Sequence, residues 1–395
     1  MAASTQWRSI AVLTFAGFIA SFQIGKAAIA APLLRQDLEL TILLASLIFS
    51  VYALLGAVAG LPAGILISRW NPRTTTSAGL AAIGLASLTG GLADDGNVLL
   101  ATRIVEGIGF IGVVIAAPTL IRTLAAPQDR TYAMTWWSLY MPGGSATMMV
   151  AGPWLMAATG WHGLWITNGV IALAYAFVIW LALPALPAET RATPPLGETL
   201  ADVFKGPGPL LLAAGFFIYV FQYFAVTGLL PVLLVERLGL SVGQAGAIAA
   251  LTVAANGLGT TAAGFAVRRG IPLWAILCVG YLTLGTTAAG VFTENAPVTL
   301  VAVLACIGLG VSGLIPSSSL AAIPRIARDT AQASVALGLL TQASALGQLL
   351  GPVALGGFVE HFGWAFAPLL FVILTVVGLT IAFVLKRLLT AQQGA

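Results

Sequence analysis

The sequence predicts an all-α integral membrane protein whose twelve transmembrane helices form two six-helix bundles related by a pseudo-twofold axis. Three observations support this fold class: twelve long apolar segments, positive charge concentrated in alternate gaps between them, and an internal repeat. Hydrophobic residues make up 59% of the 395 positions and charged residues 8%, whereas about 25% of the residues in a soluble domain are charged. Because so few charges cannot cover the surface of a soluble protein of this length, most of the surface is expected to face lipid.

Each apolar segment is long enough to cross a bilayer, which requires about 20 apolar residues. Continuous apolar runs lack the alternation of barrel strands, so the segments are expected to be helices, which satisfy their own backbone hydrogen bonds in lipid. Pro142 and Pro316 are each expected to bend a helix, because proline lacks a backbone N–H group. The predicted spans are 10–34, 42–68, 74–93, 98–121, 132–158, 162–183, 210–235, 242–267, 271–292, 297–320, 332–358 and 365–387.

Lysine and arginine are concentrated in every second gap between the apolar segments. Of the 17, 13 lie in one set of gaps or in the tails, and two, Arg35 and Arg237, lie in the other set. The positive-inside rule therefore places the first set of gaps and both termini in the cytoplasm, beside a plasma (inner) membrane. The net charge of +4 follows from this topology, so no nucleic-acid partner is expected. The 13 residues are Arg8, Arg69, Arg73, Arg122, Arg130, Arg191, Lys205, Arg268, Arg269, Arg325, Arg328, Lys386 and Arg387.

A polar, proline-rich segment separates the first six predicted spans from the last six. Residues 184–209 contain six prolines and five charged residues, a composition typical of a loop or linker. We therefore expect an N-terminal six-helix bundle at 1–183, a cytoplasmic linker at 184–209 and a C-terminal six-helix bundle at 210–395.

Two features of the first half recur in the second half at nearly the same offset. Gly64 and Gly264 each open a stretch that ends in two arginines, and 264 − 64 = 200. A Gly-Pro pair that begins at Gly152 recurs at Gly351, and 351 − 152 = 199. Because both halves begin on the same side of the membrane, these features predict the parallel duplication of a six-helix unit.

Three charged residues, Lys26, Arg103 and Glu106, lie well inside predicted spans, away from their ends. A charge at the centre of a membrane costs about 2.5–3.5 kcal/mol, so it persists where it meets a partner or a polar cavity. Arg103 and Glu106 form an i,i+3 pair on one helical face. One interpretation is a structural charge cluster; the other is a binding site. Two cations against one carboxylate would suit a small anion, and a proton on Glu106 would free a cation for the substrate.

Polar and aromatic residues form a stripe on the predicted span at 210–235. Tyr219, Gln222, Tyr223 and Thr227 recur at the spacing of one helical face. Because phenol and amide groups need partners in lipid, the stripe is expected either to line a cavity or to bond a neighbouring helix.

Further polar and aromatic residues are candidates for the wall of a site. Gln23 lies one turn from Lys26 on the same face, while Trp137 and Tyr140 would either wall the cavity or pack in the bundle. Other single polar residues within spans, whose role the sequence leaves open, are Tyr52, Asn256, Ser312 and Gln348.

Three short motifs fall at specific places in the apolar pattern. The loop after the second span reads G-I-L-I-S-R-W-N-P-R from Gly64 to Arg73. The fourth span reads R-x-x-x-G-x-G from Arg103, and the fifth contains the pair Gly152-Pro153. With twelve spans and a duplication, these motifs resemble the major facilitator superfamily of secondary transporters over nearly the whole chain. Within it, the chain is similar to the cyanate and nitroimidazole transporter-like group.

The first motif fits the family pattern only in part. Gly64, Arg69 and Arg73 match it, but Ser68 stands where the family has an acid, and Asn71 where it usually has glycine. The resemblance implies a gating role for the three matching residues, although the acid that helps to lock the cytoplasmic gate is missing.

The resemblance also implies a central cavity lined by the first, fourth, seventh and tenth spans, in which Lys26 faces Glu106. Glu106 is then the expected site of proton coupling. Further residues with an expected gating role are Gly152, Pro153, Gly351 and Pro352. The residues expected to bind substrate are Lys26, Gln23, Arg103, Tyr219, Gln222, Tyr223, Trp137 and Tyr140.

These observations predict a secondary active transporter that moves a small solute, an organic or inorganic anion, by alternating access with proton coupling. No phosphate-binding loop or metal-ligand spacing occurs in the sequence, so no cofactor and no metal are expected. Away from the ends of the spans there is one carboxylate and no histidine, which argues against an enzyme. The expected partners are the substrate, protons and membrane lipid, and the chain is expected to be a monomer. The alternatives are a proton-driven exporter of drugs or amphiphiles, and a non-transporting sensor or scaffold.

Overall fold

The computed structural model describes residues 4–68, 70–184, 207–326 and 330–393, and the regular elements in these ranges are helical. This architecture confirms the predicted all-α fold. The elements are α1 (Trp7–Asp37), α2 (Ile42–Ser50), η1 (Val51–Ala53), α3 (Leu54–Ser68), α4 (Pro72–Gly90), α5 (Gly96–Leu124), η2 (Pro127–Asp129), α6 (Arg130–Ser138), α7 (Tyr140–Ala182), α9 (Pro207–Val232), η3 (Leu233–Arg237), α10 (Val242–Arg268), α11 (Leu273–Val291), α12 (Val298–Ser312), α13 (Leu314–Ile326), α14 (Thr330–Phe362), η4 (Trp364–Phe366) and α15 (Ala367–Gln393).

Within the described ranges, nine helical stretches are long and apolar enough to cross a membrane. One of them, Tyr132–Ala182, contains two of the predicted spans. These spans meet at Gly160, whose φ of 66° interrupts the helix and favours glycine. Two predicted spans, 74–93 and 332–358, are not among these nine stretches. They correspond to α4 and α14, which are helical in the structure. α4 is rich in serine, threonine and glycine, and α14 contains three glutamines.

Several predicted spans are interrupted in the structure. The span at 42–68 consists of α2, the short 3₁₀ turn η1, and α3. α6 and α7 are separated at Leu139, and α12 and α13 at Gly313. Each of these two breaks lies three residues before a proline, Pro142 or Pro316. Proline lacks the N–H group and its ring crowds the preceding turn, so the interruption falls just before the proline itself.

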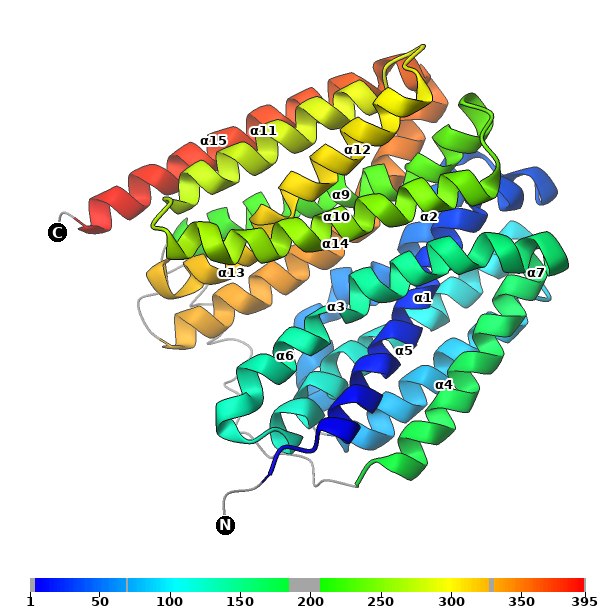
Figure 1. Cartoon of the computed structure of the whole chain (residues 1–395), viewed down its shortest axis with the longest axis horizontal. Coiled ribbons are helices and arrows are strands. Elements are labelled where there is room, and N and C mark those ends of the chain that lie inside the picture. Colours follow the sequence, from blue (N-terminus) through cyan, green and yellow to red (C-terminus); the bar gives the residue numbers. More distant parts are fainter. Residues whose placement is uncertain (1–3, 69, 185–206, 327–329, 394–395) are drawn as a thin grey trace.

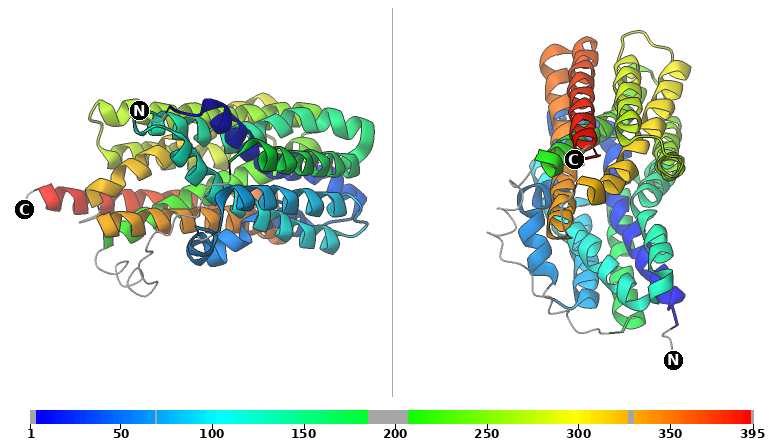
Figure 2. Two further views of the ribbon diagram at one scale, coloured as in Figure 1. Left: turned by 90° about the horizontal axis from the view of Figure 1, so that it is seen from below. Right: turned by 90° about the vertical axis from the view of Figure 1, so that its left-hand side faces the viewer.

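The helices form two groups that lie side by side in Figure 1: the N-terminal half (α1–α7) and the C-terminal half (α9–α15). α1 begins and α15 ends at the same end of the long axis (Figures 1 and 2), which we call the terminal end. The opposite end is called the far end. The halves touch where α7 meets α10, where α14 meets α2 and α3, and where α1 meets α9. The predicted linker at 184–209 falls almost wholly outside the described residues, so a domain division there stays a prediction.

The two halves are joined by polar contacts at the far end. Arg35, near the end of α1, forms an ion pair with Glu236 of η3. Glu360 of α14 accepts a hydrogen bond from the backbone N–H of Leu43, with 2.9 Å between the two atoms. These contacts hold α1 and α2 against the C-terminal half at the far end.

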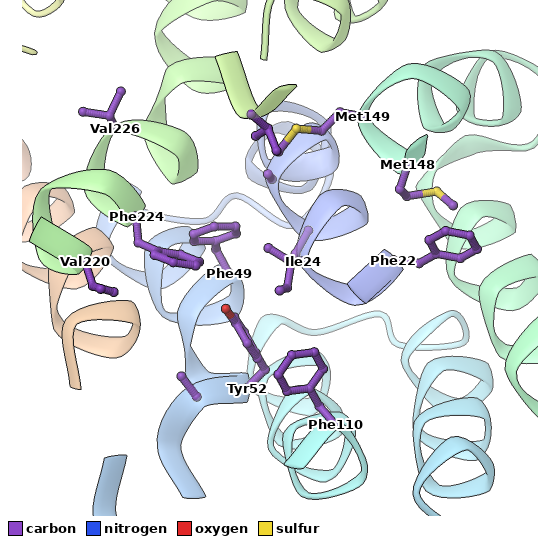
Figure 3. Close-up of a cluster of buried hydrophobic side chains, with 14 of the residues drawn as sticks. Phe22, Ile24, Phe49, Tyr52, Phe110, Met148, Met149, Val220, Phe224 and Val226 are labelled. Atoms are coloured by element: carbon purple, nitrogen blue, oxygen red, sulfur yellow. The ribbon is translucent and has the colours of Figure 1, made fainter. Parts of the chain in front are cut away.

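An apolar plug lies deeper in the molecule, formed by Ile24, Phe49, Met149 and Phe224 from α1, α2, α7 and α9 (Figure 3). Each of these side chains is at most 6% exposed. The ring centroids of Phe49 and Phe224, which belong to different halves, are 6.3 Å apart. Since side chains of both halves are packed here without exposure to solvent, the plug fills the centre of the molecule at this level.

Candidate substrate-binding site

A fully buried charge cluster lies inside the N-terminal half. Lys26 Nζ lies 2.6 Å from Glu106 Oε1, and Arg103 forms an ion pair with the other carboxylate oxygen, Oε2. Lys26 also donates to Ser87 Oγ at 2.6 Å and lies 4.6 Å from the ring centroid of Trp165. None of the three charged side chains is exposed. The structure therefore brings together the charges that the sequence analysis singled out, while their role in substrate binding stays a prediction.

Arg103 also contacts the backbone where α2 ends. Its Nε donates to the carbonyl of Ile48 at 2.9 Å, and its Nη2 donates to the carbonyl of Phe49 at 3.4 Å. The chain leaves the α-helical path directly afterwards, at η1, so these donors serve carbonyl groups beside the irregular turn. A planar guanidinium can bind a carboxylate and two carbonyls together, which the single ammonium of a lysine does less well. Arg103 thus ties α5 to the break in the second span.

A cavity of about 290 Å³ lies between the two halves. Its wall is formed by η1, α3, α5 and α7 on one side and by α9, α13 and α14 on the other. Most of the lining is apolar, with Phe110, Met141 and Phe216 among the larger side chains, and the polar groups include Tyr52 and Gln348. The described lining residues include no charged side chain. Because they come from the parts of these helices nearest the terminal end, the cavity lies on that side of the plug.

The charge cluster lies one helical turn behind the cavity wall, toward the far end. Glu106 precedes the lining residue Phe110 by four positions in α5, about 6 Å along the helix axis. Tyr52 connects the two regions, because its ring lies 5.4 Å from that of Phe110 and 5.7 Å from the guanidinium carbon of Arg103. A cation at this distance is attracted by the face of an aromatic ring.

The predicted stripe on α9 takes part in a neutral polar cluster of the C-terminal half. Asn256 Nδ2 donates to the Tyr219 hydroxyl at 3.3 Å, to the Leu309 carbonyl at 2.8 Å and to Ser312 Oγ at 3.3 Å. These contacts join α9, α10 and α12. Tyr223 is half-buried, and its ring centroid lies 5.9 Å from that of Tyr219.

Gln23 and Gln222 are buried with incomplete hydrogen bonding. Gln222 Nε2 donates to the Ile218 carbonyl at 3.4 Å, but its Oε1 has no partner among the described residues. Neither amide atom of Gln23 has a partner there. An unpaired buried amide is costly, so both side chains are suited to receive a water molecule or a polar group of a substrate.

Trp137 and Tyr140 lie together where α6 gives way to α7. Their rings are stacked with 4.5 Å between the centroids. Tyr140 lines the cavity, whereas Trp137 packs against α1 at Gly17, where any added side chain would collide with both residues. Among the described residues that line this cavity, Tyr140 is the single member of the eight predicted to bind substrate. None of the described lining residues belongs to α1, although the family resemblance implied that the first span would line the cavity.

The Gly-Pro pairs occupy closely packed positions. Gly351 lies against the backbone of Phe221, whose carbonyl any side chain at this position would hit, and Gly152 lies against α1. Pro153 lines a second, apolar pocket, and Pro352 lies inside α14. This packing explains why small residues stand here, while the expected gating role stays a prediction.

The loop motif after α3 is described only in part. Arg69 and the surroundings of Gly64 lie outside what the structure describes. Arg73 Nη1 donates to the Leu183 carbonyl at 3.1 Å, and its guanidinium lies 4.5 Å from the ring centroid of Trp180. A cation at the carboxyl end of a helix is favourable, so Arg73 ties α4 to the end of α7; its gating role stays a prediction.

Three residues of the site were missed as site residues from the sequence. The Tyr52 hydroxyl donates to Gln348 Oε1 at 2.7 Å across the two halves, and Ser87 accepts from Lys26. Tyr52 and Gln348 were visible as isolated polar residues in apolar spans, a signal that does not say which face of the helix points to the cavity. Ser87 carries no signal, because serine often bonds its own helix backbone in membranes.

Two helical halves around a central cavity, with charges buried beside it, define a class of protein: the polytopic membrane transporters. The sequence profile of the Major Facilitator Superfamily matches residues 13–280 and 212–394. The chain therefore belongs to this superfamily, and it is a secondary transporter with a small-molecule substrate rather than an enzyme.

Known proteins of this family share modest identity with the chain over most of its length. The 4-hydroxybenzoate transporter PcaK of Pseudomonas aeruginosa is 26% identical, covering 99% of this chain and 94% of its own. An MFS-type efflux pump of Mycolicibacterium smegmatis is 24% identical, covering 89% of this chain and 83% of its own.

Solved structures show the same fold. A bacterial homologue of the human lysosomal transporter Spinster, in an inward-facing and occupied conformation, matches with a TM-score of 0.84 and 16% identity over 97% of both chains. The nucleoside transporter NupG matches with a TM-score of 0.77 and 13% identity over 96% of this chain and 99% of its own. At these identities the likeness concerns the fold alone.

Proposed function

We propose that this transporter moves a small organic anion with an apolar body by alternating access, and that it couples this movement to protons through Glu106. The observation that carries the proposal is the charge cluster: two cations and one carboxylate, all fully buried, one turn behind the cavity wall.

The cluster carries an excess positive charge. Lys26 and Arg103 contribute two positive charges and Glu106 one negative charge, so the formal sum is +1. No second carboxylate pairs with these groups within the described part of the chain. Charges in a protein interior act over longer distances than in water, so the excess favours an anion in the neighbouring cavity.

The cavity supports an organic substrate of modest size. Its volume of about 290 Å³ lies at the lower limit for small-molecule sites, which range over roughly 300–1,000 Å³. Aromatic and aliphatic walls such as Phe110, Met141 and Phe216 suit an apolar body more than a hydrated inorganic ion. The similarity to a 4-hydroxybenzoate transporter supports an aromatic carboxylate as the first class to test.

Glu106 is the group that we assign to proton coupling. It binds both cations, so a proton on its carboxylate would remove the negative charge of the cluster and raise the excess from one to two. A more positive cluster attracts an anion more strongly, and by linkage a bound anion favours the proton to the same degree. Proton and anion binding therefore reinforce each other, which predicts symport.

Uptake by the purified protein in proteoliposomes tests this function. Radiolabelled benzoate is expected to accumulate under an inward proton gradient, and other small carboxylates are expected to compete. Lys26→Met keeps the length of the side chain but removes the excess charge. It should lower uptake about tenfold, the scale of one charge acting across roughly 10 Å of protein. Arg269→Gln removes an exposed charge and serves as the matched control. Undiminished uptake by Lys26→Met would overturn the anion site.

Export of amphipathic compounds is the second candidate, because the described cavity lining is uncharged and largely apolar. The similarity to an MFS-type efflux pump supports it. Transport of tetraphenylphosphonium without competition by carboxylates would select this function. Competition by cyanate rather than benzoate would instead favour the resemblance to the cyanate and nitroimidazole transporter-like group.

We also propose that the protein is a monomer in the inner membrane with both termini and the linker at 184–209 in the cytoplasm. The distribution of lysine and arginine supports this orientation, in which the cavity lies on the cytoplasmic side of the plug. An impermeant thiol reagent added to whole cells should label Glu39→Cys at the far end but not Arg269→Cys. The reverse pattern would invert the topology.

A further inference from the structure

We propose that Tyr52 is a positioning residue for alternating access. Its hydrogen bond to Gln348 holds the two halves in the arrangement with the cavity at the terminal end, and Arg103 sets the position of its ring. This role does not depend on which substrate is transported.

The bond between Tyr52 and Gln348 joins the two halves at the cavity. The hydroxyl of Tyr52 donates to Gln348 Oε1 at 2.7 Å. Gln348 Nε2 in turn donates to Ser344 Oγ at 2.9 Å, which leaves the amide oxygen directed to Tyr52. Tyr52 is 1% exposed and Gln348 is half-buried, so the bond is largely shielded from solvent, and a bond in such surroundings is strengthened by the low local dielectric.

The ring of Tyr52 is held from within the N-terminal half. The guanidinium carbon of Arg103 lies 5.7 Å from the ring centroid, and Phe110 packs edge-on at 5.4 Å. Gly107 of α5 lies against the Tyr52 backbone, where any side chain would hit the Tyr52 carbonyl. Tyr52 is the central residue of η1, and Arg103 also binds the carbonyls that precede this turn. The charge cluster therefore fixes the hydroxyl that reaches the other half.

Opening of the plug would move the segment that carries Tyr52. Phe49 of the plug lies three residues before Tyr52, at the end of α2, and packs against Phe224 of the other half. When the halves rock and the plug separates, α2 and η1 must shift relative to α14. The bond to Gln348 then stabilises one state and not the other, so its removal shifts the equilibrium toward the state that opens at the far end.

Thiol labelling of the substrate-free protein measures this equilibrium. The reporter is Met149→Cys in the plug, placed in a chain whose two cysteines are replaced, Cys278→Ala and Cys306→Ala. N-ethylmaleimide reaches this site only when the plug opens, because Met149 is 1% exposed. Tyr52→Phe retains the ring and loses the hydroxyl. It should raise the labelling rate about fivefold, the shift that follows from the loss of one hydrogen bond.

A double-mutant cycle separates this bond from general loosening. Gln348→Leu should raise labelling to the same degree, and the double variant should label no faster than either single variant. Tyr175→Phe is the matched control, since its hydroxyl bonds to the Val12 carbonyl within one half, and it should leave labelling unchanged. With the reporter Thr341→Cys in the cavity wall, Tyr52→Phe should give an equal or lower rate.

Three outcomes would contradict the proposal. The first is an unchanged labelling rate of Met149→Cys in Tyr52→Phe. The others are a faster rate in the double variant than in either single variant, and a higher rate at both reporters. If Met149→Cys does not fold, Ile24→Cys in the same plug replaces it. Because the measurement contains no substrate, its failure would leave the proposed anion transport intact. A failure of benzoate uptake would likewise leave the role of Tyr52 intact.

Discussion

In the N-terminal half, α1, α2 and α5 are joined by Lys26, Glu106 and Arg103, whereas in the C-terminal half α9, α10 and α12 are joined by Tyr219, Asn256 and their neighbours. Under the repeat offset of about 200 residues, these two sets of helices occupy equivalent places in the duplicated unit. One set is linked by ionised groups and the other by neutral hydrogen bonds. The six-helix unit can therefore be held together at this place without any charge.

The residues at equivalent positions of the two halves differ in charge. Adding 199 to the numbers of Lys26 and Glu106 leads to Ala225 and Ala305, which are 0% and 2% exposed. Gln23 leads in the same way to a second glutamine, since 23 + 199 = 222. A glutamine is thus present at this position in both halves, whereas the charged residues occur only in the N-terminal half. Because alanines pack in the other half, the charges are unnecessary for packing, which supports a role for them in transport.

Among the substitutions that test this comparison, loss of the Glu106 carboxylate is expected to lower the free energy of unfolding most. Glu106→Gln leaves two buried cations without a counter-charge, which should lower the free energy of unfolding by about 3–5 kcal/mol. Thermal melting of the detergent-purified protein measures this change, with Glu106→Asp as the control that retains the charge. An unaltered melting temperature in Glu106→Gln would contradict the view that the carboxylate holds the cluster together.

The neutral cluster should be less sensitive to loss of its central residue. Asn256→Leu has a similar volume but removes the amide that donates to the Tyr219 hydroxyl, the Leu309 carbonyl and Ser312 Oγ. The free energy of unfolding should fall by about 1–3 kcal/mol, less than for Glu106→Gln. Benzoate uptake should stay within a factor of about three once the amount of folded protein is equalised. A greater loss of stability than in Glu106→Gln would reverse the ranking of the two clusters.

Removal of all three charges together should be better tolerated than removal of one. The variant Lys26→Met, Arg103→Met, Glu106→Leu makes the N-terminal half resemble the C-terminal half at this place. Since apolar side chains often replace a buried ionic network without loss, the melting point should correspond to a change of about 1 kcal/mol or less. Anion uptake should nevertheless be lost. If the triple variant transports benzoate as well as the wild type, the charges serve neither packing nor transport.

The ion pair at the far end should contribute least. Arg35 and Glu236 have 19% and 33% of their side chains exposed, and exposed pairs contribute about 0.2–1 kcal/mol. Arg35→Gln should therefore lower the unfolding free energy by less than 1 kcal/mol, and 1 M salt should erase the difference because it screens exposed charges. Melting curves of the two proteins at low and high salt provide the measurement. A salt-independent loss would point to a packing role of Arg35 instead.

Much of the fold and part of the candidate site could be predicted from the sequence. Long apolar segments can only be helices in lipid, while the orientation that the alternation of positive charge indicates stays a prediction. Lys26, Arg103 and Glu106 were expected to meet because a charge inside a membrane needs a partner. That Lys26 would face Glu106 was an implication of the family resemblance. The carbonyls of Ile48 and Phe49 could not be foreseen as partners of Arg103, since they become available only where α2 ends. Ser87 gave no sign that it would bond Lys26 rather than its own helix.

The sequence by itself determined the class of protein, the helices and the identity of the buried charges, because lipid tolerates so few alternatives. Only the tertiary structure decided which faces of the helices line the cavity, and thus that Tyr52 and Gln348 meet between the halves while Lys26 lies behind the wall. The physical reason is that lipid and protein interior are equally apolar. Trp154 is 80% exposed and Phe224 is 6% exposed, yet no hydrophobic pattern distinguishes them, so helix rotation is set by packing between distant segments.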